Sequence, residues 1–172
     1  MIELGRKQAL MVVKKTEFGV YLGTEDDKVL LPAKYADPDI EEGDSMTVFV
    51  YRDSKDRLIA TTLEPLITLG EVKPLKVKQL TKIGAFMDWG LEKDLLLPFS
   101  EQTSRVEEGR TYPVALYIDK SDRLCATTKI YPYLKTTDAY HTGDGVKGTA
   151  YEYIEKFGMF VAIDNMYQGL IP

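Results

Sequence analysis

The heptapeptide Asp56-Arg57-Leu58-Ile59-Ala60-Thr61-Thr62 returns in the second half of the chain as Asp122-Arg123-Leu124-Cys125-Ala126-Thr127-Thr128. Self-similarity at a fixed period, here about 65 residues, marks one structural unit that is used repeatedly. A unit of this length is longer than a solenoid or propeller repeat and suits a small domain that folds by itself. The sequence therefore predicts tandem domains.

Outward from that heptapeptide, two further segments recur. A glycine among apolar residues appears three times, at Phe18-Gly19-Val20-Tyr21, Ile83-Gly84-Ala85-Phe86 and Phe157-Gly158-Met159-Phe160. A segment ending in proline follows each of them, at Leu30-Leu31-Pro32, Leu96-Leu97-Pro98 and Gly169-Leu170-Ile171-Pro172. We therefore divide the chain into a first copy at 1–66, a second at 67–138 and a partial third at 139–172.

Each copy is predicted to be all-β, because short apolar runs alternate with Gly, Asp, Asn and Pro clusters and helical periodicity is almost absent. The expected strands are 8–14, 18–23, 28–31, 46–52 and 57–62, then 74–80, 84–88, 94–97, 112–118 and 123–128. Five short strands per copy favour a small closed barrel, since closure removes exposed edges. The repeated glycine predicts a bend or bulge between the first two strands. Domains this small are marginal alone, so we expect them to lean on each other.

Composition describes an ordinary globular chain, with 44% hydrophobic and 28% charged residues. No apolar run approaches the length of a membrane helix, and the N-terminus lacks the pattern of a secretory signal. Cys125 is the only cysteine, which fits a reducing compartment and predicts a cytoplasmic protein. We expect no membrane partner.

Enzyme and metal chemistry find no support in the sequence. His141 is the only histidine, so a zinc site of the usual kind cannot be assembled, and the Asp/Glu clusters lack calcium-loop spacing. No glycine-rich phosphate loop precedes a helix, and no nucleophile–base pair stands out. We expect no cofactor, no metal and no catalytic residue.

Charge is distributed unevenly along the chain. The net charge is −5, which argues against strong non-specific binding to phosphate backbones. Residues 1–66 carry 9 Lys/Arg and 13 Asp/Glu, residues 67–138 carry 11 and 10, and residues 139–172 carry 2 and 4. The second copy is therefore the least repulsive to a polyanion.

The recurring aromatic-Gly-small-aromatic turn and the segment that follows it resemble the S1 RNA-binding domain, an OB-fold barrel. The third copy is the clearest match, with Phe157-Gly158-Met159-Phe160-Val161 leading to Gly169-Leu170-Ile171-Pro172. The first two copies lack the glycine of that later segment, and proline stands where many S1 domains have histidine. Tandem divergent copies with Leu-Leu-Pro also resemble the bacterial conserved virulence factor B family. That resemblance implies a third S1 domain and a winged-helix domain beyond residue 172, so this chain would be a fragment truncated within its third copy.

Strand alternation selects candidate binding residues. If Val20 and Leu22 face the barrel interior, Tyr21 between them faces outward, and the same reasoning applies to Phe86 and Phe160. Two aromatics across the glycine bend could share that face, namely Phe18 and Phe157. Exposed aromatics on a barrel wall stack on unpaired bases, and S1 domains generally use this surface. The alternative is that they stabilise the sheet through cross-strand contacts or pack against a neighbouring domain.

The second copy adds lysines to this surface. Lys76 and Lys78 alternate with Leu75 and Val77, so they share a solvent-facing side of the first strand. Phosphate contacts beside an aromatic surface are typical of single-strand binders, whereas a charged edge that prevents aggregation is the competing interpretation. Trp89 has the parity of Met87 and is expected to pack inward.

Two functions remain open at this point. The first is a non-catalytic, single-stranded RNA-binding protein, a post-transcriptional regulator as the family resemblance implies. The second is a protein-interaction or spacer module that positions a C-terminal domain missing from this chain. The third copy is expected to expose an apolar inner face and unpaired edges, which predicts self-association through residues 146–172.

Overall fold

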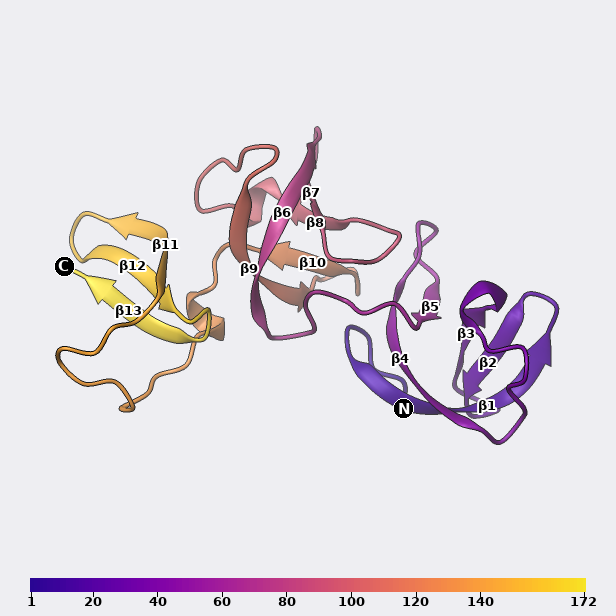
Figure 1. Ribbon diagram of the computed structural model, residues 1–172. Coiled ribbons are helices and arrows are strands. Elements are labelled where there is room, and N and C mark those ends of the chain that lie inside the picture. The colour runs from indigo at the N-terminus through magenta and orange to yellow at the C-terminus, as the bar shows by residue number, and fades with distance from the viewer.

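The computed structural model describes residues 1–172 as three β-rich lobes in a row; the C-terminus lies at the outer end of the third lobe, and the N-terminus lies on the side of the first lobe that faces the second (Figure 1). The only helical segments are three 3-10 turns, at Ala33–Tyr35, Phe99–Glu101 and Tyr131–Tyr133. None of them has the length and apolar character that crossing a bilayer would require. The prediction of an all-β chain is confirmed.

The first lobe is a closed five-stranded barrel. Its strands are β1 (Lys7–Thr16), β2 (Gly19–Gly23), β3 (Lys28–Pro32), β4 (Ser45–Arg52) and β5 (Leu58–Thr61). They close in the order β1-β2-β3-β5-β4, which is the OB-fold arrangement. All pairs are antiparallel except β3 with β5, which meet in parallel at Leu30 and Ile59. The five expected strands are all present.

The second lobe repeats this arrangement without closing it by hydrogen bonds. Its strands are β6 (Val72–Leu80), β7 (Gly84–Asp88), β8 (Leu95–Pro98), β9 (Thr111–Ile118) and β10 (Leu124–Thr127), in the order β10-β9-β6-β7-β8. Strands β8 and β10 lie side by side but form no ladder. Past the end of β10, the Thr128 amide instead donates to the Glu101 carbonyl, at 3.0 Å, so the 3-10 turn takes the place of a strand partner. The expected closed barrel is therefore only barrel-like here.

The third lobe is a three-stranded antiparallel sheet. Strands β11 (Gly148–Ile154), β12 (Gly158–Ile163) and β13 (Tyr167–Ile171) pair in that order. The lobe follows the turn at Tyr131–Tyr133, and Lys135 bridges to Tyr167 at its border.

A glycine and a bulge recur at matching places in all three sheets. Gly19, Gly84 and Gly158 have φ of +145°, +152° and +114°. A Cβ there would lie 2.0–2.3 Å from the carbonyl oxygen of Leu31, Leu97 or Ile171, so only glycine allows the strands to approach. The predicted bend is confirmed, but the bulge lies in the preceding strand, between Val12 and Lys14, Val77 and Gln79, and Ala150 and Glu152.

The core of the second barrel extends onto the outer face of the first barrel, whose interior is a separate core. Within β4, Val48 and Val50 point into the first barrel, whereas Phe49 and Tyr51 belong to the core cluster of the second. Trp89 contacts Phe49 and Tyr51 edge-on, with ring centroids 5.7 and 6.0 Å apart. Trp89 is thus buried as predicted, but between the barrels rather than inside one. The expectation that the domains lean on each other is confirmed.

The third sheet packs on the second barrel through its outer face. This face carries Phe160 and was expected to lie open to solvent. Ala162 is fully buried against Val72, Ala115, Ile130 and Leu134, and Tyr151 packs beside them. The opposite face, which matches the barrel interior of the other copies, is open: Tyr153 is 64% exposed, and Ile171, in the same row beyond Met159, is 60% exposed. A bulge at Tyr151 turns that side chain toward the second barrel, which is why Tyr151 and Tyr153 do not share a face.

Candidate nucleic-acid interface

One arrangement of side chains recurs on the outer face of all three sheets. The central aromatic of the second strand lies between a polar residue on the first strand and a leucine on the third. The three rows are Lys14–Tyr21–Leu30, Gln79–Phe86–Leu96 and Glu152–Phe160–Leu170. Directly opposite residues project from the same face of a sheet, so each row forms one continuous surface. We call each row a platform.

The first platform carries two lysines that sequence reasoning missed. Val20 and Leu22 are buried, so Tyr21 stands on the outer face as alternation predicts. The Lys28 ammonium lies 5.8 Å from the centre of its ring, and Lys14 lies directly across the sheet. The bulge in β1 is what sets Lys14 opposite Tyr21, and a bulge has no clear signature in a single sequence. Phe18, at the adjacent turn, is 71% exposed.

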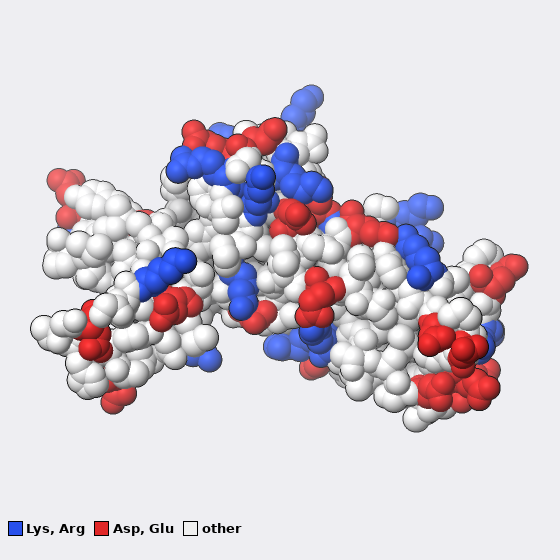
Figure 2. Space-filling view, viewed as in Figure 1, with Lys and Arg blue, Asp and Glu red and all other residues white.

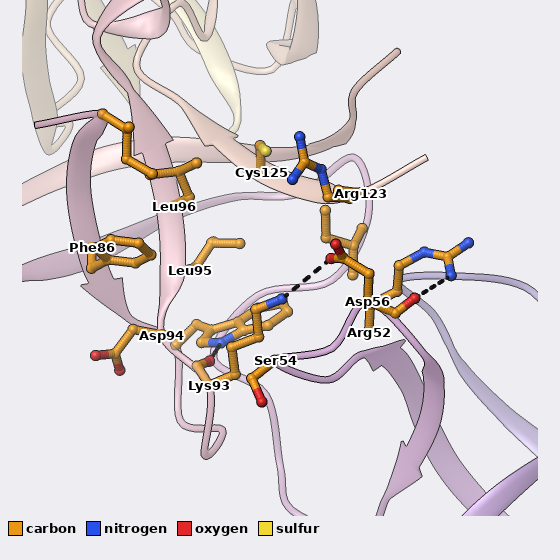
Figure 3. Close-up of a pocket in the computed structure, with 13 residues that line it drawn as sticks. Arg52, Ser54, Asp56, Phe86, Lys93, Asp94, Leu95, Leu96, Arg123 and Cys125 are labelled. Carbon is orange, nitrogen blue, oxygen red and sulfur yellow. Dashed lines mark hydrogen bonds and ion pairs between the residues drawn. The ribbon is translucent and has the colours of Figure 1, made fainter. Parts of the chain in front are cut away.

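The second platform borders a cavity of about 230 Å³ between the first two barrels (Figure 3). Phe86 and Leu96 form one side of this cavity, while Arg52 and Asp56 of the first barrel face them from the other. Ile83 occupies the position of Phe18, so this copy offers one exposed aliphatic side chain where the first offers a ring.

The predicted lysine row of the second copy is partly neutralised. Leu75 and Val77 are buried, and Lys76 and Lys78 are exposed, as alternation predicts. The Lys78 ammonium, however, lies 3.1 Å from the Asp94 carboxylate, and Asp88 stands directly opposite Lys76. Figure 2 shows the same mixture across the middle lobe, where Lys and Arg are interspersed with Asp and Glu.

Two cationic groups of the cavity are held by hydrogen bonds to the protein. The Arg52 guanidinium donates to the Asp56 and Asp122 carbonyls, at 2.9 and 2.8 Å. The Lys93 ammonium donates to the Asp53 carbonyl, at 3.0 Å. These contacts join hairpin tips of both barrels, so Arg52 and Lys93 connect the barrels and are not free for a ligand.

The third platform is the most aromatic. The Phe160 ring contacts Tyr131, Tyr151 and Phe157, with centroids 5.9, 6.3 and 6.4 Å away. Beside it is a hollow of about 460 Å³, which we call the aromatic hollow, lined by Tyr131, Glu152, Ile154, Phe157, Phe160 and Leu170. Tyr131 belongs to the 3-10 turn that precedes the third sheet, and the sequence did not single it out as a candidate. Its aromatic character beside a proline was the one available sign.

Cys125, the only cysteine, lies outside the platforms. Cys125 is buried, and burial together with the nearby Asp119 carboxylate raises the pKa of its thiol to about 11. The thiol therefore stays protonated at neutral pH, as expected of an inert buried cysteine. No three His, Cys, Asp or Glu side chains gather where they could hold a metal ion.

Comparison with known proteins identifies the repeated unit. The uncharacterized protein YitL of Bacillus subtilis is 35% identical over 94 residues, which cover 54% of this chain and 32% of YitL. A crystal structure from Streptococcus pneumoniae, described as a multidomain protein with nucleic acid binding domains, superposes with a TM-score of 0.64 at 20% identity. That match covers 95% of this chain and 60% of the other, and it shows a shared fold. The family profile of the S1 domain matches residues 4–63 and 69–129, and the chain therefore belongs to the S1 domain family.

Proposed function

We propose that this protein is a non-catalytic, single-stranded RNA-binding protein of the cytoplasm that acts in post-transcriptional regulation. The observation that carries the proposal is the platform, an aromatic and a leucine at the same register on three sheets. The S1 assignment and the nucleic acid binding domains of the Streptococcus protein support it. The resemblance to the virulence factor B family gives the regulatory role.

A single strand is the form of nucleic acid that fits these surfaces best. A ring on an open barrel wall can stack on a base only if that base is not already stacked in a duplex. Each such contact contributes about 1–3 kcal/mol, and every base has a π-face, so the platforms accept many sequences. The platforms are therefore expected to discriminate strand state first.

Electrostatics is expected to contribute little. The chain carries a net charge of −5, and Lys78 must leave Asp94 before it can contact a phosphate. Because few phosphate contacts release few counterions, the affinity should fall only weakly as salt rises.

Titration of a labelled single strand tests the proposal. Fluorescence anisotropy would follow a fluorescein-labelled RNA of roughly a dozen nucleotides, and the same strand annealed to its complement, at low and high salt. Tight binding of the single strand and weak binding of the duplex is the expected result. No binding of the single strand at about 100 µM protein in low salt would overturn the proposal.

A second candidate function, a spacer or protein-interaction module, is favoured by one observation. Ile67 of the linker is fully buried in the core of the second barrel, which extends onto the first, so the first two barrels form a rigid pair. Rigidity suits a spacer, and the acidic first copy suits a protein partner more than RNA. This candidate predicts that the platform substitutions below leave all binding of the protein unchanged.

We also propose that the chain self-associates through residues 146–172. The open face of the third sheet presents Tyr153, Met159, Val161 and Ile171. Its outer strands β11 and β13 each have one edge without a strand partner, and on β13 only the start of that edge is paired, by Lys135. A second copy of the same sheet supplies both an apolar surface and strand edges, and it therefore satisfies both needs.

A further inference from the structure

The aromatic hollow on the third sheet contains one charged side chain among aromatic and aliphatic ones. Its lining consists of Tyr131, Ile154, Phe157, Phe160, Leu170 and the carboxylate-bearing Glu152. The volume of about 460 Å³ lies within the ~300–1,000 Å³ range of small-ligand sites. In such sites the few polar groups fix orientation and specificity. The chemistry of Glu152 therefore decides which base the hollow prefers.

Glu152 is available to a ligand. It is half-buried and lies directly across the sheet from Phe160, the platform aromatic. Its carboxylate forms no ion pair and no hydrogen bond with another side chain of this chain. A carboxylate at the edge of a stacking surface offers two acceptor oxygens and no donor.

The residue opposite the platform aromatic differs in every copy, whereas an aromatic and a leucine recur in all three. Opposite the aromatic ring the first sheet has Lys14, a cation, and the second has Gln79, an amide. Tyr or Phe and a leucine complete all three rows. A constant stacking surface with a changing polar neighbour is the pattern expected where one position sets base preference.

We propose that the aromatic hollow selects guanine, with Glu152 accepting hydrogen bonds from the N1–H and 2-amino group of the base. This inference rests on the proposed RNA-binding function and adds a base preference to it. Guanine is the base whose Watson–Crick edge places two donors side by side. Adenine, cytosine and uracil each place an acceptor next to their donor, which would meet a carboxylate oxygen with repulsion.

The phosphates of the bound strand would pass the hairpin end of the hollow, where the turn between β11 and β12 carries Lys156. The carboxylate of Glu152 repels them, whereas the Lys156 ammonium lies 5.6 Å from the Phe157 ring centre and can meet a phosphate. The base edge thus points to Glu152 and the backbone to Lys156. The polarity of the site matches that of a nucleotide.

A base-substitution series on the full chain tests the preference. The probes are fluorescein-labelled heptamers of uridine whose central nucleotide is guanosine, inosine or adenosine, measured by anisotropy. The protein carries Tyr21→Ala and Phe86→Ala, so that the third platform is the remaining one. We expect the guanosine probe to bind about tenfold more tightly than the adenosine probe, as for a bidentate base contact. Inosine lacks only the 2-amino group and should lose most of that preference.

A charge-matched pair of variants separates specificity from general affinity. Glu152→Gln replaces one acceptor oxygen by a donor and should reduce the guanosine-to-adenosine ratio to about one, as the bidentate contact is lost. Glu155→Gln removes the same charge from an exposed turn residue outside the hollow and should keep the ratio. Equal binding of all three probes, or a ratio that survives Glu152→Gln, would overturn the guanine preference while RNA binding stood. If no probe bound either the parent protein or the variant with Tyr21→Ala and Phe86→Ala, the proposed function would be overturned as well.

Discussion

The aromatic ring of each platform is the residue on which RNA binding should depend most. Phe86→Ala together with Lys78→Ala should weaken single-stranded RNA binding roughly tenfold, most of it from Phe86, since stacking contributes about 1–3 kcal/mol per base. Lys78 adds less because it is already paired with Asp94. Anisotropy titrations give the affinity, and circular dichroism should show an unchanged fold because both side chains lie on the outer face. Parent-like affinity of the double variant would place the site on another copy.

Gly84, the first residue of β7, is required for a steric reason. Gly84→Ala puts a Cβ 2.3 Å from the Leu97 carbonyl oxygen at a φ of +152°, so it should destabilise the protein by about 3 kcal/mol or more. Gly109, at φ +84° with nothing within 4 Å, isolates the cost of the φ angle, about 1–2 kcal/mol on substitution by alanine. Urea unfolding measures both. Equal losses would show that the close approach of the strands is unimportant.

At the scale of elements, the hairpin tips repeat as faithfully as the strands. Asp53 accepts backbone N–H bonds from Lys55 and Arg57, and Asp119 accepts them from Ser121 and Arg123. Partial burial raises the pKa of the Asp119 carboxyl, but hydrogen bonds from Arg123 and Ser121 outweigh it and hold that pKa below the usual range. This is the physical reason for the repeated Asp-x-x-Asp-Arg in the sequence.

The lowered pKa of Asp119 fixes the sign of a pH effect. A carboxyl with a depressed folded-state pKa contributes stability above its unfolded value of about 3.9, and that contribution is lost as pH falls through the folded pKa. Asp119→Asn should therefore reduce the free energy of unfolding at pH 7 and make its decline in acid shallower. Denaturant titrations at a series of pH values below about 5 would reveal this. An unchanged acid profile would contradict it.

Strands were predictable from sequence, whereas their neighbours across the sheets were not. The run 84–88 was expected and found as β7, because alternation in a half-buried strand leaves a pattern in the residues themselves. The bulges that set Lys14 opposite Tyr21, and Glu152 opposite Phe160, shift the register by a residue that looks like any other. The Lys78–Asp94 pair likewise joins β6 to the loop that precedes β8.

Packing between copies does leave a pattern in the sequence, although the predictions above did not use it. Val48 through Tyr51 is an unbroken apolar run in which every residue is buried, since one face of β4 fills the first barrel and the other meets Trp89. Strands buried on both faces read as continuous hydrophobic runs. Ala115 matches Phe49 in the second copy, and it meets Ala162 of the third sheet.

The first copy contacts the second in much the same way as the second contacts the third. In each case the outer face of the fourth strand packs against the end of the second strand of the next copy. Trp89 packs on β4, and Ala162 packs on β9. The face of the third sheet that packs in this way is the one that also carries Phe160. This explains why a residue expected to be fully open is half-buried beside the second barrel.

The interface between the first two barrels should behave as core. Phe49→Ala should destabilise the protein by about 3–5 kcal/mol, as for a buried aromatic. The emission of Trp89, the only tryptophan, should move to longer wavelength as water reaches it. Phe18→Ala, which removes an exposed ring, serves as the control and should leave emission and stability unchanged. Parent-like emission in Phe49→Ala would show that the barrels do not rely on this contact.

Self-association is a property of the entire chain and is tested at that level. Sedimentation velocity across a wide concentration range should show reversible growth beyond the monomer. Tyr153→Lys with Ile171→Lys, on the open face, should abolish it by placing charges there, whereas Met11→Lys on the first barrel should not. A monomer at every concentration would contradict the proposal.

The contact of Trp89 with Phe49 and Tyr51 also bears on how the protein is made. The first barrel emerges from the ribosome before Trp89 does, so Phe49 and Tyr51 meet water, or a chaperone, in the nascent chain. Until the second barrel forms, the outer face of β4 in the first barrel stays uncovered. A pause in translation after the first barrel has emerged and before the second has done so would lengthen that exposure, so codon choice downstream of Trp89 bears on how long the contact surface stays uncovered.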